Sequence, residues 1–148
     1  GTLYLVASNQ GLRGVHWKKS SAPLLSELQG SEPKIKILKQ AVQELEQYFA
    51  GKRKTFDVPL DLIGTDFQKK VWDQLLKIPY GQTMSYREIA TKIQNEKACR
   101  AVGTANGRNP VAVIVPCHRV IATDGTLGGY AGGLDNKTSL LRLESTQV

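Results

Sequence analysis

One stretch of the sequence decides how the rest is interpreted: Asn109-Pro110-Val111-Ala112-Val113-Ile114-Val115-Pro116-Cys117-His118-Arg119. Its middle, residues 111–115, is a short, apolar and mostly β-branched run, which is typical of a buried strand. A strand here would deliver Cys117 and His118 directly from the core. The stretch therefore predicts a core strand that ends in a cysteine, a base and a cation.

Cys117 is the candidate nucleophile of this stretch. The thiol of a free cysteine has a pKa of about 8.5, and a neighbouring cation or hydrogen-bonding group can lower that pKa. His118 is a candidate base, and Glu144 in the last predicted helix is a candidate to orient it. The alternative is a buried core cysteine at a strand end, which is the commoner setting for a lone cysteine.

Upstream of this stretch, the sequence outlines a helix-turn-helix. Capping-box patterns occur at Thr65-Asp66-Phe67-Gln68 and at Ser85-Tyr86-Arg87-Glu88, and each predicts the start of a helix. A turn at Asn95-Glu96 separates the second of these helices from a third, over residues 98–106. The first helix is expected to bury four side chains: Phe67, Val71, Trp72 and Leu75.

The third helix has an unusual composition. One face, expected to pack on the core, consists of Ala98, Ala101, Val102 and Ala105, and the other consists of Arg100, Gly103, Thr104 and Gly107. A helix that reads the major groove normally carries several long polar side chains. Small residues beside Arg100 would instead allow a close approach of the backbone to a minor groove, with Arg100 entering the base stack. The alternative is that the small residues only allow tight helix packing, and the composition of this helix by itself favours that alternative.

The remaining segments predict an N-terminal lobe over residues 1–64 and a C-terminal lobe over residues 65–148. The first lobe would have two strands within residues 3–17, a loop over 18–33, a helix ended by Gly51, and an extended linker over 52–64. That helix would bury Ile35, Leu38, Val42, Leu45 and Phe49. The second lobe would finish with a loop or hairpin over 120–133 and a helix over 135–144. In this last helix Asp135 is the expected N-cap, and Leu140, Leu141 and Leu143 are expected to face inward.

Charge and cysteine content narrow the function classes. The net charge of the 148 residues is +7, and most of the excess lies after Asp66, which favours a polyanion such as nucleic acid as partner. Two cysteines and two histidines give neither a disulfide framework nor a structural zinc site. We therefore expect no metal, no cofactor and a reducing, cytoplasmic setting. No apolar run is long enough to span a membrane, so no membrane partner is expected.

Several motifs together resemble the O6-alkylguanine-DNA alkyltransferase family. Besides Pro116-Cys117-His118-Arg119-Val120-Ile121, they are Ile78-Pro79-Tyr80-Gly81, Ser85-Tyr86, Arg100-Ala101-Val102-Gly103, Gly128-Gly129-Tyr130-Ala131-Gly132-Gly133-Leu134 and Leu140-Leu141-Arg142-Leu143-Glu144. The resemblance covers about residues 65–145 clearly and the N-terminal lobe more loosely. It implies an α/β (α+β) fold, with a small ribonuclease-H-like lobe before a mainly helical lobe that carries a winged-helix-like helix-turn-helix.

The resemblance also implies catalytic roles. Cys117 would accept the alkyl group irreversibly, His118 would take the thiol proton through a water, and Glu144 would fix the histidine tautomer. Tyr130 would donate a hydrogen bond to the leaving guanine, and Asn109 would be the hinge between helix and strand that completes the pocket. Without the resemblance, Tyr130 could equally be a packing aromatic and Glu144 a surface carboxylate.

The DNA-binding roles come from the same resemblance. Arg100 would fill the space left by the flipped nucleotide, and Tyr86 would press on its phosphate. Ala101, Gly103 and Thr104 would lie against the DNA. The expected partner is double-stranded DNA that contains O6-alkylguanine, and also O4-alkylthymine, bound by a monomer; cooperative binding along DNA stays open.

Two other functions remain possible from the sequence. A cysteine-histidine hydrolase or acyltransferase would regenerate its thiol and need an oxyanion hole, for which only the glycines near Gly132 are candidates. A non-catalytic sensor of alkylated bases would need no cysteine, so Cys117 argues against it. Cys99 lacks a neighbouring base and is interpreted as a small helix residue.

Overall fold

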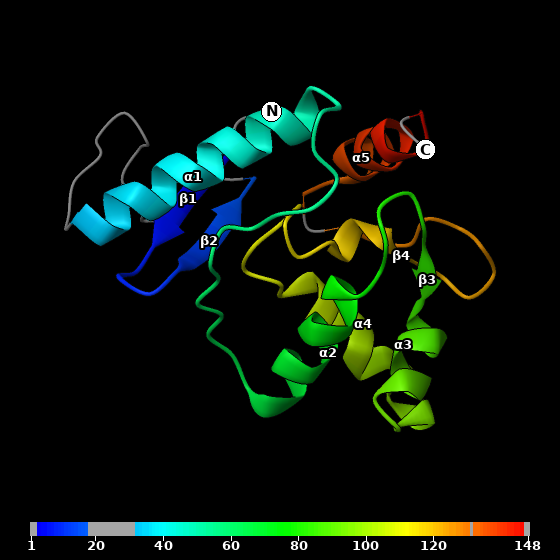
Figure 1. Cartoon of the computed structure of the whole chain (residues 1–148). Coiled ribbons are helices and arrows are strands. Elements are labelled where there is room, and N and C mark those ends of the chain that lie inside the picture. Colours follow the sequence, from blue (N-terminus) through cyan, green and yellow to red (C-terminus); the bar gives the residue numbers. More distant parts are fainter. Residues whose placement is uncertain (1–2, 18–31, 131, 147–148) are drawn as a thin grey trace.

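The computed structural model describes residues 3–17, 32–130 and 132–146 (Figure 1). The N-terminal part forms a hairpin of β1 (Tyr4–Ala7) and β2 (Leu12–His16), which pair in antiparallel fashion with Leu5 opposite Val15. Helix α1 (Glu32–Phe49) lies across this hairpin. The predicted pair of strands is confirmed. Most of the predicted loop over 18–33 lies outside the described residues, and its last two positions begin α1 instead.

The buried face of α1 differs from the predicted one. Leu45 is buried as expected, but Phe49 is 43% exposed, and Tyr48 beside it is fully buried. Glu44 is buried too, because its carboxylate accepts backbone N–H groups from residues 57 and 58. The prediction counted only apolar residues, so it missed polar side chains whose hydrogen bonds allow their burial.

The segment between the two parts runs along β2. Leu12 and Leu60 form a parallel bridge, with hydrogen bonds from Leu12 N to Pro59 O and from Asp61 N to Leu12 O. A Cβ at Gly11 would lie 2.7 Å from the backbone of Leu60, so this close approach requires glycine. The extended conformation predicted for residues 52–64 is therefore fixed against the N-terminal sheet around residue 60.

Three helices form the centre of the C-terminal part: α2 (Asp66–Leu76), α3 (Tyr86–Lys92) and α4 (Cys99–Gly107), the last preceded by a short 3₁₀ turn at Glu96–Ala98. Both predicted capping boxes are present, at Thr65 with Gln68 and at Ser85 with Glu88. Strand β3 (Met84–Ser85) pairs in parallel with β4 (Val120–Ile121), and α5 (Leu134–Thr146) closes the chain. Asp135 lies inside the first turn of α5, so its prediction as N-cap is wrong.

The predicted strand over residues 111–115 is also wrong. Val111 makes only an isolated bridge to Val15 of β2, after which the chain turns, with hydrogen bonds from Ile114 N to Ala112 O and from Val115 N to Val111 O. Val113 has φ +70, a left-handed conformation that is unfavourable for a β-branched residue. All five side chains are nonetheless buried. The apolar run thus predicted burial correctly and conformation incorrectly.

One hydrophobic core spans both parts of the chain. It joins Leu12 and Val15 of β2 to Trp72 of α2 and Val102 of α4, all of which are at most 1% exposed. The indole of Trp72 also donates a hydrogen bond to the carbonyl of Ala105, 2.9 Å away. The N-terminal part is therefore packed directly on the C-terminal part, and Val15 of β2 bridges to Val111 at the start of the buried segment that leads to Cys117. Within the described residues, no helix is long and apolar enough to cross a membrane.

Candidate active site

Cys117, His118 and Arg119 form a single 3₁₀ turn directly after the buried segment, and all three are at most 6% exposed. The turn is held by a hydrogen bond from Arg119 N to Pro116 O at 3.0 Å. The Asn106 amide of α4 also donates to the carbonyl of Cys117, at 3.4 Å. Because the backbone turns here, the three neighbouring side chains reach different partners.

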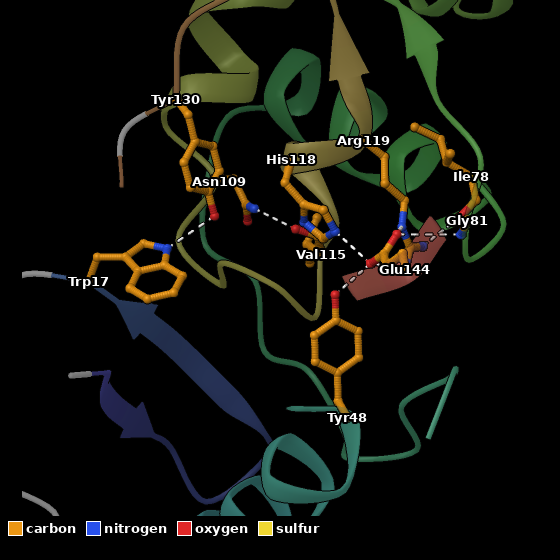
Figure 2. A network of polar contacts seen from close by, with 10 residues as sticks. All are labelled: Trp17, Tyr48, Ile78, Gly81, Asn109, Val115, His118, Arg119, Tyr130 and Glu144. Atoms are coloured by element: carbon orange, nitrogen blue, oxygen red, sulfur yellow. Dashed lines mark hydrogen bonds and ion pairs between the residues drawn. The ribbon is translucent and has the colours of Figure 1, made fainter. Parts of the chain in front are cut away.

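His118 pairs with Glu144 of α5, as predicted (Figure 2). Its Nε2 lies 2.7 Å from Oε2 of Glu144, so the proton between them makes Nε2 the donor. The other ring nitrogen, Nδ1, is buried and has no hydrogen-bond partner among the described residues. Burial lowers the pKa of His118, although the bond to Glu144 opposes this, and the neutral ring can accept a proton at Nδ1.

Glu144 accepts hydrogen bonds on both carboxylate oxygens. Oε2 also accepts from Tyr48 Oη at 2.5 Å and from Arg119 Nη2 at 2.9 Å, while Oε1 accepts from Arg119 Nε at 2.8 Å and Gly81 N at 3.4 Å. Burial alone would raise the pKa of Glu144, but the hydrogen bonds and charges of His118 and Arg119 lower it to about 2. The carboxylate is therefore ionised and accepts hydrogen bonds from four residues.

Arg119 does not act on the thiol, despite its position two residues later. Its guanidinium binds Glu144 and donates from Nη1 to the carbonyl of Ile78 at 2.7 Å. The cation whose charge favours the Cys117 thiolate is instead Lys137 of α5. Burial raises the pKa of Cys117, and it is opposed by hydrogen bonding from the Asn109 side chain, the charge of Lys137 and the Tyr130 hydroxyl.

Lys137 is a buried cation that the sequence interpretation missed. Its Nζ donates to the carbonyls of Val120, Leu127 and Gly129, and the side chain is 0% exposed. These carbonyls fix the segment that leads to Tyr130. The sequence signal for Lys137 was its spacing. Lys137 lies three residues before Leu140 and seven before Glu144, so the three side chains share one face of the helix.

Asn109 and Tyr130 lie on the other side of His118 from Glu144 (Figure 2). Asn109 spans the turn, since its Nδ2 donates to Val115 O at 2.7 Å and its Oδ1 accepts from Val111 N at 3.0 Å. The predicted hinge at Asn109 therefore joins a helix to a turn rather than to a strand. Tyr130 Oη accepts a hydrogen bond from the indole of Trp17, at 3.0 Å.

Four of the five predicted DNA-binding residues lie together where the start of α3 meets the outer side of α4. Tyr86, Arg100, Gly103 and Thr104 line one open hollow, which Lys97 and Cys99 complete. A Cβ at Gly103 would lie 3.8 Å from the ring of Tyr86. Ala101 is exposed, so its predicted packing on the core is wrong, while Val102 and Ala105 are buried as expected.

Comparison with known proteins defines the class of protein. The ribonuclease-like domain of the 6-O-methylguanine DNA methyltransferases matches residues 1–62, and the DNA-binding domain of the same proteins matches residues 66–146. A two-domain protein with a ribonuclease-like and a helical DNA-binding domain is the predicted fold class, which is confirmed. The chain belongs to the methylated-DNA–protein-cysteine methyltransferase family.

Individual relatives agree over the whole chain. A methylated-DNA–protein-cysteine methyltransferase of Methanosarcina barkeri is 47% identical over 148 residues, which is 100% of this chain and 93% of the relative. The crystal structure of the Mycobacterium tuberculosis O6-methylguanine methyltransferase is 43% identical, with a TM-score of 0.75 over 99% of this chain and 93% of that one. A Mycobacterium tuberculosis structure in complex with DNA is 44% identical, with a TM-score of 0.81 over 99% and 88%.

Proposed function

We propose that this protein repairs O6-alkylguanine, and O4-alkylthymine, in double-stranded DNA by moving the alkyl group onto Sγ of Cys117. The observation that carries the proposal is the burial of Cys117 next to His118, whose ring is hydrogen-bonded to Glu144, in a chain of this family. The likeness to a structure crystallised with DNA supports DNA as the partner. We place the boundary between the two domains after Gly64, and we expect the protein to act as a monomer.

The reaction begins with the thiol proton. His118 accepts it at Nδ1 through a water, and Glu144 stabilises the resulting imidazolium through Nε2. The thiolate then attacks the alkyl carbon, so that an S–C bond forms as the bond from carbon to O6 breaks. The electron pair leaves with the guanine, which a hydrogen bond from Tyr130 stabilises. Asn109 and Lys137 favour the thiolate from the other side.

The product explains why the reaction stops. A thioether on Cys117 has no proton to lose and cannot form a thiolate, and its sulfur is a poor leaving group from an alkyl carbon, so the alkyl group stays on the protein. Each molecule therefore accepts one alkyl group. This also separates the proposal from a hydrolase, whose thiol is regenerated in each cycle.

DNA enters over the outer face of α4. A base within the duplex cannot reach a buried thiol, so it must be extruded at a cost of a few kcal/mol. Arg100 would occupy the vacated space in the stack, and Tyr86 would press on the phosphate of the extruded nucleotide. The small side chains of Ala101, Gly103 and Thr104 would let the helix approach the minor groove closely.

A mass measurement tests the proposal. Protein is mixed with excess duplex that contains O6-methylguanine, followed by intact mass analysis and peptide mapping. We expect one methyl group per molecule on Cys117, with no further reaction, and the same result for the control Cys99→Ser. Continued turnover would favour a hydrolase, and unmodified protein bound to the DNA would favour a sensor.

A further inference from the structure

The N-terminal domain reaches the reacting groups from two sides (Figure 2). Tyr48 of α1 donates its hydroxyl to Glu144, on one side of His118. Trp17, directly after β2, donates its indole N–H to Tyr130, on the other side of His118. Neither residue belongs to the C-terminal domain, which supplies all the reacting side chains.

The side chain of Tyr48 is fully buried and closely packed. Its side chain is 0% exposed, and its ring packs edge-on against Phe49 and Tyr80, with centroids 5.2 and 6.1 Å away. A buried hydroxyl requires a hydrogen-bond partner, and the partner here is a charged carboxylate at 2.5 Å. The bond is therefore both short and protected from water.

The contact falls on the oxygen that also holds the base. Oε2 of Glu144 accepts from Tyr48 Oη and, at 2.7 Å, from His118 Nε2. The ionisable groups that face this carboxylate are Tyr48 from α1, Tyr80 from the turn after α2, and His118 and Arg119 from the 3₁₀ turn. Removing the Tyr48 hydroxyl would leave Arg119 and Gly81 as the donors other than His118 on the carboxylate. Because these donors lie away from α1, the carboxylate could then shift toward them and weaken its bond to the imidazole.

We propose that Tyr48 is a positioning residue for alkyl transfer, whose hydroxyl holds Glu144 in the orientation that keeps His118 in its Nε2–H tautomer. The inference rests on the proposed function of Cys117 and His118. Trp17 positions Tyr130 in a comparable way. Its indole N–H donates to the phenol oxygen, which orients the Tyr130 hydroxyl and makes that hydroxyl a better hydrogen-bond donor. The N-terminal domain thus takes part in the reaction through two hydrogen bonds.

The test compares Tyr48→Phe with Tyr80→Phe. Tyr80 is a matched control, because its hydroxyl is buried in the same aromatic cluster and has no hydrogen-bond partner among the described residues. We expect Tyr48→Phe to slow methyl transfer from duplex DNA about tenfold, as for loss of one hydrogen bond to a charged group, with unchanged DNA affinity. Tyr80→Phe should behave as the unmodified protein does.

A spectroscopic readout separates positioning from stability. The chain has only two histidines, His16 and His118, so ring nitrogen signals can be assigned by NMR with a His16→Gln variant. We expect a single Nε2–H tautomer of His118 in the protein alone and a mixture of tautomers in Tyr48→Phe. In a Glu144→Gln background, Tyr48→Phe should have no further effect on the rate, because its route to His118 is already lost.

The outcomes are distinct. A normal rate and a single tautomer in Tyr48→Phe, or an equal loss in Tyr80→Phe, would overturn the proposal. If the unmodified protein takes no methyl group from DNA, the proposed function fails, while the tautomer measurement still decides the role of Tyr48. If Tyr48→Phe does not fold, Trp17→Phe tests the second contact, with a loss of about threefold expected for one neutral hydrogen bond.

Discussion

The site around Glu144 and the outer face of α4 are built in opposite ways. Around Glu144, long polar side chains from α1, the 3₁₀ turn and α5 are buried and joined by short hydrogen bonds. On α4, small side chains lie exposed beside one long cation, Arg100. The buried region fixes groups before the reaction, and the exposed face leaves room for a duplex. Variants in the two regions should therefore separate chemistry from DNA approach.

The largest effect is expected for Cys117→Ala. This change removes the only proposed acceptor, so no methyl transfer should be measured by mass, while duplex affinity stays unchanged because the α4 face is intact. Cys99→Ser, which alters the other cysteine, serves as control. Cys99 lines the hollow on α4, so the variant is compared at saturating duplex, where it should still accept one methyl group per molecule. Methylation of the Cys117→Ala protein at another residue would contradict the assignment.

Glu144→Gln should damage both chemistry and stability. The buried guanidinium of Arg119 loses its counter-charge, for which we expect a loss of about 3 kcal/mol in the free energy of unfolding, measured with urea. His118 loses the charge that stabilises its imidazolium, so transfer should slow roughly 100-fold. Normal transfer by a folded Glu144→Gln protein would show that the charge of Glu144 is not needed for His118 to accept the thiol proton.

Acid should weaken the same region. The pKa of Glu144 is lowered to about 2 from its ordinary value of 4.5, so its stabilising effect is present above pH 4.5 and is lost as the pH falls toward 2. We expect about 3 kcal/mol of the free energy of unfolding to disappear across this window. The Glu144→Gln protein should lack this part of the slope, and an identical slope in both proteins would contradict the pairing.

Arg100→Ala should affect duplex substrates selectively. Transfer from O6-methylguanine in duplex DNA should slow about 30-fold, because extrusion of the base loses part of its compensation. Reaction with the free modified base should be unchanged, since Arg100 lies outside the buried site. Lys97→Ala removes a neighbouring cation from the same hollow and should only weaken salt-dependent binding. Equal losses on both substrates would exclude the proposed role of Arg100.

The smallest effect is expected for Gly103→Ala. The added Cβ meets the Tyr86 ring at ordinary contact distance, and alanine favours helix, so stability should rise by up to about 1 kcal/mol. Duplex affinity, measured by fluorescence anisotropy, should fall a few-fold because the helix can no longer approach as closely. A gain in stability without loss of affinity would mean that Gly103 does not face the DNA.

Much of this arrangement could be predicted from local sequence. The capping boxes at Thr65 and Ser85 place α2 and α3, because side-chain caps depend on residues only three positions apart. The family motifs indicated which positions would lie near Cys117 and on α4. The pairing of His118 with Glu144 followed from the same motifs.

What could not be predicted depends on distant parts of the chain. The turn at Val113 forms because β2 offers Val111 a bridge and the core buries the apolar run, and neither is visible in residues 111–115 alone. Tyr48 and Lys137 were missed because they are polar residues on faces expected to be apolar. Their partners, Glu144 and three loop carbonyls, appear only when the fold is known.

The burial of Cys117, at 6% exposure, also protects the protein before it meets its substrate. Peroxides, disulfides and soluble alkylating agents react with exposed thiolates, and a buried thiol with a raised pKa is a poor target for them. An alkyl group on an extruded base would reach Sγ more readily than these freely diffusing agents, because protein contacts would place it there. Molecules with an unmodified Cys117 would thus persist until they meet a lesion. Because each would accept one alkyl group, their number would set how many lesions can still be repaired.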